Sequence, residues 1–83
     1  MTREEAEEAC EGEPALFVDG FDNCIIGVSY FPCKVAYNVD LMITFMMQEL
    51  QIDLDESLEH MAHNIEGAYM GENTPLFIYG FNL

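Results

Sequence analysis

The spacing of apolar and polar positions divides the chain into segments with strand-like and helix-like patterns. Residues 24–37 are rich in β-branched and aromatic side chains and are interrupted at Pro32, which predicts a β-hairpin. Gly27, in the middle of its first strand, indicates a bulge or a close approach of another backbone segment. Residues 76–79 predict a third strand, and the brief apolar run at 15–18 is a candidate edge strand.

The segment 40–50 predicts a helix that is apolar on almost every side. Asn38 or Asp40 can cap its N-terminus. Its one polar stripe consists of Thr44, Gln48 and Gln51. A helix with this pattern has to be buried on more than one side.

A further helix is predicted to begin at Asp53, because Asp53 and Glu56 have the spacing of a capping box. We expect it to end near Gly71. Its expected buried stripe consists of Leu58, Met61, Ala62, Ile65, Ala68 and Tyr69. The methionines Met42, Met46, Met47, Met61 and Met70 are expected to be mostly core residues.

The N-terminal segment 2–12 predicts a short acidic helix, with Thr2 as N-cap and Glu5 three residues later. The expected fold class is therefore α+β. It comprises a small, mostly antiparallel three-stranded sheet with two helices on one face, plus the short acidic N-terminal helix. We expect an acidic arm over residues 1–20 and a single α+β domain over residues 21–83.

Charge limits the classes of partner. Sixteen acidic residues face only Arg3 and Lys34, so the formal net charge is −14 in 83 residues. Such a surface repels nucleic acid and anionic membranes. It attracts a basic protein and speeds the encounter with it. Because 51% of the residues are hydrophobic, the chain can build a core and does not have the composition of a disordered segment.

Carboxylates on successive helical turns can take the place of phosphates in a groove lined with Arg and Lys. The candidate partner-binding residues are Asp53, Asp55, Glu56, Glu59, Glu66 and Glu72, with Glu4, Glu5, Glu7 and Glu8 as an accessory arm. Two alternatives remain open: a solvated face that keeps the protein in solution, and adaptation to high salt.

Catalytic and metal-binding patterns are weak. His60 and His63, with Glu56 and Glu59, have helical spacing that could supply zinc ligands, but no established zinc motif accompanies them. Two surface histidines among carboxylates are the favoured interpretation. No serine or cysteine has a convincing base beside it in the pattern. We therefore expect no enzyme activity, no cofactor and no metal.

Cysteine usage indicates the compartment. Cys10, Cys24 and Cys33 are an odd number, which favours free thiols in a reducing environment. A disulfide between Cys24 and Cys33 across the hairpin is the less favoured alternative. The first residues lack the pattern of a signal peptide, so a cytoplasmic location in a host cell is expected.

One segment resembles a known family. Residues 64–77 follow the pattern Asn-x-x-Gly-Ala-x-x-Gly-x-x-Thr-Pro-x-Phe, and the stretches 21–28 and 37–40 also look similar. The pattern resembles a family of short phage and prophage proteins of unassigned function. The resemblance implies a phage protein that blocks a host nuclease or defence complex. An anti-CRISPR or anti-restriction inhibitor that mimics DNA is the concrete form of this hypothesis. The rival hypothesis is a homodimeric structural or assembly module that pairs through the helix at 41–50, with its charge serving only solubility.

Overall fold

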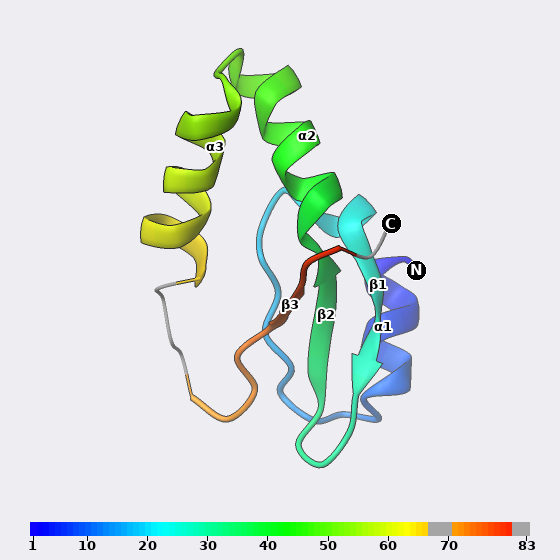
Figure 1. The fold of residues 1–83 in the computed structure, drawn as a ribbon. Helices are drawn as coiled ribbons and strands as arrows, with labels where there is room; N and C mark the ends of the chain where they lie inside the picture. The colour runs from blue at the N-terminus through cyan, green and yellow to red at the C-terminus, as the bar shows by residue number, and fades with distance from the viewer. Residues whose placement is uncertain (67–70, 81–83) are drawn as a thin grey trace.

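A computed structural model describes residues 1–66 and 71–80 and shows an α+β fold (Figure 1). Its sheet has the order β1 (Ile25–Ser29), β2 (Lys34–Asn38) and β3 (Leu76–Ile78). β1 and β2 are antiparallel, whereas β2 and β3 are parallel. The predicted α+β class with a mostly antiparallel three-stranded sheet is confirmed, and the parallel pairing of β3 is a feature that the pattern did not predict.

The hairpin of β1 and β2 turns at residues 30–33. Its register shifts between Ile25 and Gly27, so the bulge predicted at Gly27 is present. The extra residue without a partner in the ladder is Ile26, directly before Gly27, and Gly27 itself pairs with Ala36. At the tip, Phe31 is 96% exposed.

Helices α2 (Val39–Leu50) and α3 (Leu54–His60) connect the parallel strands β2 and β3. The π-helical segment η2 (Met61–Glu66) continues α3 directly. Figure 1 shows α2 rising from the end of β2 and α3 running back beside it, so that both reach beyond the sheet. The packing of both helices on one sheet face stays a prediction.

Side-chain caps explain where these helices begin. Asn38 Oδ1 accepts a hydrogen bond from the Leu41 amide at 3.1 Å, and Asp53 Oδ1 accepts one from the Glu56 amide at 2.9 Å. Of the two candidate caps for α2, the structure uses Asn38. Both caps satisfy backbone donors that have no partner within the helix.

Helix α1 (Arg3–Ala9) lies beside β1 (Figure 1). The capping box expected from Thr2 and Glu5 is present. A Cys10–Cys33 disulfide joins the end of α1 to the start of β2, whereas Cys24 is a buried free thiol. The expectation of three free thiols was therefore wrong, and the pair is not the one considered across the hairpin. The pairing depends on a contact between segments distant in the sequence, which spacing alone does not predict.

The core is built mainly from β1, β2 and α2, with Met61 added from the start of η2. Its largest fully buried side chains are Tyr37, Met42, Met46 and Met61. The Tyr37 hydroxyl accepts a hydrogen bond from the Val18 amide at 2.8 Å. This bond fixes the segment 15–18 as an irregular chain over the core. The strand suggested there is absent, because its backbone bonds to a side chain instead of a neighbouring strand.

Several expected core residues lie at the surface. Leu58 and Ala62 are exposed, and of the predicted stripe on the second helix Met61 is buried and Ile65 partly buried. Met47 is also exposed, unlike Met42, Met46 and Met61. Ala68, Tyr69 and Met70 lie outside the described residues. Within residues 1–66 and 71–80, no helix has the length and hydrophobicity needed to cross a membrane.

Candidate functional site

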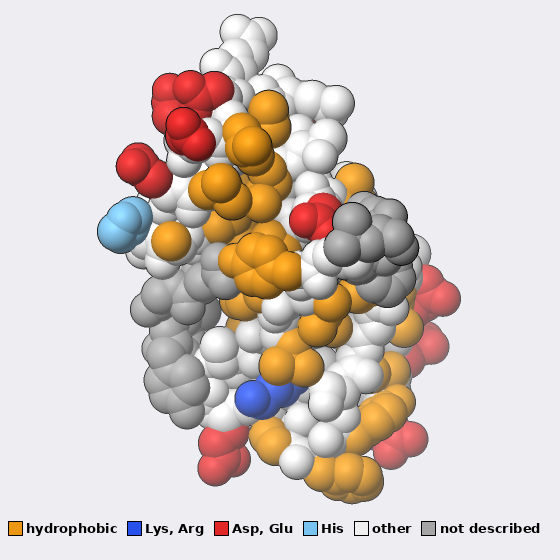
Figure 2. Space-filling view, viewed as in Figure 1, with side chains coloured by type: hydrophobic (Ala, Val, Ile, Leu, Met, Phe, Trp, Pro, Cys, Tyr) orange, Lys and Arg blue, Asp and Glu red, His pale blue; other side chains and the backbone are white. Residues whose placement is uncertain are grey.

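Three exposed carboxylates lie on α3: Asp55, Glu56 and Glu59. Asp55 and Glu59 are one helical turn apart, on adjacent positions of the same side. Figure 2 shows acidic side chains gathered along the outer side of the molecule where α3 lies. Throughout the described part of the chain, every ion pair involves Arg3 of α1, so these carboxylates have no basic partner among those residues.

The other predicted residues of this group have different surroundings. Asp53 is exposed, but its side chain caps α3 and thus has a structural role. Glu66 ends η2, where the structure describes only the backbone. Glu72 is exposed in the turn that precedes β3. Of the predicted site residues, three therefore lie exposed together on one helix: Asp55, Glu56 and Glu59.

The accessory arm forms a separate acidic surface on α1. Its members are all exposed: Glu4, Glu5, Glu7 and Glu8. A Glu5 carboxylate oxygen accepts a hydrogen bond from the Thr2 backbone amide at 2.8 Å, and this bond lowers the pKa of Glu5. Glu7 lies 3.7 Å from Arg3. Since α1 and α3 lie on opposite sides of the molecule in Figure 1, the structure does not unite the two groups into one surface.

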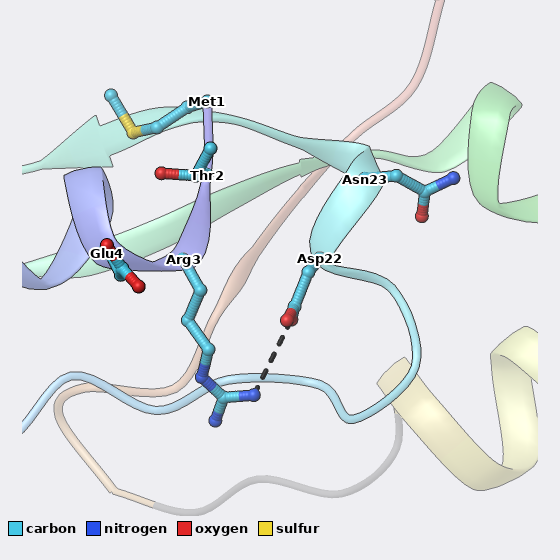
Figure 3. Close-up of a pocket in the computed structure, with 6 residues that line it drawn as sticks. All are labelled: Met1, Thr2, Arg3, Glu4, Asp22 and Asn23. Atoms are coloured by element: carbon cyan, nitrogen blue, oxygen red, sulfur yellow. Dashed lines mark ion pairs between the residues drawn. The ribbon is translucent and has the colours of Figure 1, made fainter.

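Arg3 is the centre of a cluster that sequence reasoning did not identify. Its guanidinium lies 3.5 Å from Asp22 and 3.8 Å from Asp19, with the guanidinium carbon 4.3 Å from the centre of the Phe17 ring. Figure 3 shows Arg3 reaching from α1 toward Asp22 beside a hollow of about 460 Å³. The signal available in the sequence was that Arg3 is one of only two bases. These contacts hold α1 against the segment 17–22 and use the positive charge of Arg3 internally.

Metal-binding and nucleophilic groups give no site among the described residues. No cluster of three or more His, Cys, Asp and Glu side chains there could hold a metal ion. The candidate ligand His60 instead has its Nδ1 atom 3.3 Å from the side-chain Nδ2 atom of Asn64. Burial raises the pKa of the Cys24 thiol, which therefore keeps its proton and is a weak nucleophile.

A groove of about 430 Å³ runs between α2 and α3. Its apolar lining comes from Ile43 and Met47 of α2, Leu54 and Leu58 of α3, and Tyr79 after β3. Figure 2 shows these hydrophobic surfaces as a continuous patch next to the acidic side of α3. Sequence reasoning missed the groove because it assigned Leu58 and Met47 to the core. The signal in the sequence was the helix at 40–50, which is apolar on almost every side. One of its apolar faces packs on the core, and another lines the groove.

Comparison with known proteins gives no relative. The chain matches no protein-family model, no curated protein and no solved structure. The resemblance to short phage proteins thus stays a prediction.

Proposed function

We propose that this protein is a non-enzymatic inhibitor that binds a basic, nucleic-acid-handling protein by presenting carboxylates in place of phosphates. The observation that supports this proposal is the exposed group Asp55, Glu56 and Glu59 on one helix, with no basic side chain paired to it among the described residues. Such a group is available to pair with the basic side chains of a partner.

The physical basis is the spacing and the field of these carboxylates. Side chains one helical turn apart have Cβ atoms about 5–6 Å apart, which is comparable to the separation of successive phosphates along one strand. Arg side chains that recognise phosphate also form paired hydrogen bonds with carboxylate. The net charge of −14 attracts a basic surface over a distance and raises the association rate.

The biological form of the proposal is a phage protein that evades host defence as an anti-CRISPR or anti-restriction inhibitor, acting in the host cytoplasm. The resemblance of residues 64–77 to phage proteins supports this form. The Cys10–Cys33 disulfide weighs against a strongly reducing compartment, because such bonds persist mainly in oxidising ones. Mimicry of nucleic acid does not depend on the compartment and is proposed independently of it.

The test begins with capture of partners from a bacterial lysate on the tagged full-length protein, followed by elution with DNA and identification by mass spectrometry. Association and dissociation rates with the captured protein are then measured for the variant Asp55→Asn, Glu56→Gln, Glu59→Gln. We expect its association rate to fall about tenfold, with a smaller change in dissociation, because the loss is mainly electrostatic.

A comparison variant removes the same number of charges from the other side of the molecule, through Glu4→Gln, Glu8→Gln and Glu11→Gln, two of them in the accessory arm. Because α1 lies on the opposite side from α3, we expect this variant to retain most of the wild-type association rate. Equal losses in both variants would assign the effect to net charge and contradict a site on α3. A captured partner that DNA does not displace would contradict mimicry itself.

A further inference from the structure

The groove between α2 and α3 exposes several large apolar side chains to solvent. Leu54 is 51% exposed, Leu58 43% and Tyr79 55%. These residues lie together along one groove instead of being scattered. Contiguous exposed apolar patches on small proteins mark interaction surfaces.

The shape of the groove suits a helical occupant. Ile43 and Met47 are one turn apart on α2, and Leu54 and Leu58 are one turn apart on α3. Two helices therefore supply two apolar rows, one along each wall. An amphipathic helix binds such a groove by placing side chains spaced at i, i+3, i+4 and i+7 between the walls.

The charge beside the groove selects among occupants. Asp55 and Glu59 directly follow Leu54 and Leu58, so an acidic row runs along the apolar row of α3 (Figure 2). Asp40 lies on the lining from the α2 side, where its carboxylate accepts a hydrogen bond from the Gly80 amide at 2.8 Å. Both basic residues of the chain, Arg3 and Lys34, are on other elements: α1 and β2.

A second copy of the chain is a poor match for this surface. In a symmetric contact the same patch meets itself, which brings two acidic rows and two chains of net charge −14 together. A segment with apolar side chains on one face and Lys or Arg beside them complements both the lining and its edge.

We propose that the α2/α3 groove binds a basic amphipathic helix of the partner protein. The inference rests on the proposed function only for the basic character of that partner. The groove supplies apolar contact, and Asp55 and Glu59 pair with the flanking cations. Apolar burial would lower the dissociation rate, while the acidic field raises the association rate.

The test uses a synthetic helical peptide about 18 residues long, with Leu at amphipathic spacing and Lys elsewhere. Its comparison is a scrambled peptide of identical composition and charge, which lacks an apolar face. We expect the full-length protein to bind the amphipathic peptide at least about tenfold more tightly in calorimetry at physiological salt. Amide chemical shifts should change around Ile43, Met47, Leu54 and Leu58.

The groove variant Leu54→Gln, Leu58→Gln keeps residues that favour helix and should weaken peptide binding about tenfold. Its matched control, Leu41→Gln with Leu50→Gln, changes two exposed leucines that do not line the groove and should bind within about twofold of wild type. Circular dichroism of both variants verifies that the fold is retained.

Equal binding of the scrambled peptide would show that charge alone drives binding and would overturn the inference. Equal losses of affinity in the groove variant and its control would also overturn it, and so would the absence of any peptide binding. Light scattering that finds a wild-type dimer, dissociated by the groove variant, would assign the groove to a second copy instead. The peptide assay contains no nucleic-acid-handling protein. Peptide binding to the groove can therefore be absent while DNA still displaces the captured partner, and peptide binding can be present when DNA does not displace it.

Discussion

Tyr37 connects three parts of the molecule through one buried side chain. Its ring stacks on Phe77 of β3 with centroids 6.1 Å apart, its backbone belongs to β2, and its hydroxyl holds the Val18 amide. Burial raises the pKa of this phenol, and burial also raises the pKa of the Cys24 thiol. Both groups are thus held in their neutral forms by the fold.

The variant Tyr37→Phe removes the acceptor for the Val18 amide. We expect its free energy of unfolding at neutral pH to fall by about 1–2 kcal/mol, because a buried donor is left unsatisfied. The matched change Tyr30→Phe, at an exposed ring on the hairpin tip, should cost almost nothing. Urea unfolding at pH 7 measures both.

The same variant also tests the pH dependence. The pKa of Tyr37 is higher in the folded protein than in the unfolded chain. The contribution of the neutral phenol to the free energy of unfolding is therefore complete below the unfolded-state pKa, and it is lost as the pH rises through the folded-state pKa. Wild-type stability should therefore decline between about pH 8 and pH 11, with Cys24 contributing first. Tyr37→Phe should flatten the upper part of this decline, and an unchanged profile would contradict the assignment.

At the scale of elements, the Cys10–Cys33 disulfide fixes α1 to the sheet across a sequence separation of 23 residues. We expect the double variant Cys10→Ser, Cys33→Ser to lose about 3 kcal/mol of stability, because the unfolded chain regains the freedom that the closed loop removed. Thermal unfolding with and without a reducing agent measures this. Reduction should destabilise the wild type and leave the double variant unchanged; equal effects on both would show that the bond does not stabilise the fold.

Local signals predicted the elements better than their assembly. Thr2 with Glu5, Asn38 and Asp53 specified helix starts, because a cap acts within one turn of the chain. Gly27 likewise specified its bulge. The disulfide, the parallel β3 and the exposed Leu58 depend on contacts between distant segments, which local spacing does not encode.

The candidate site shows the same division. Exposed carboxylates on α3 followed directly from the helical pattern that placed Asp55, Glu56 and Glu59 among polar positions. The separation of the α1 acids from α3 follows from the docking of α1 beside β1, and the groove beside Leu54 and Leu58 follows from how α2 and α3 pack.

For the whole molecule, like charges oppose compaction. At a net charge of −14, repulsion among carboxylates is stronger in the folded chain than in the expanded one. Raising NaCl from about 20 mM to about 200 mM should screen this repulsion and add roughly 1 kcal/mol to the free energy of unfolding. Denaturant unfolding at each salt concentration measures the change. Sodium sulfate at equal ionic strength is the control, and a response seen only with sulfate would indicate ion exclusion and contradict screening.

The parallel pairing of β2 with β3 has a consequence for the order of folding. β1 and β2 are neighbours in the chain and close a short loop, whereas β3 has to return across the whole of α2, α3 and η2. Closing that long loop costs more entropy, so we expect the β1–β2 hairpin to form early and β3 to dock late. By the same logic we expect β3 to be the strand that leaves first when the native protein opens. Its departure uncovers the backbone edge of β2, and amide hydrogen exchange would follow that opening strand by strand.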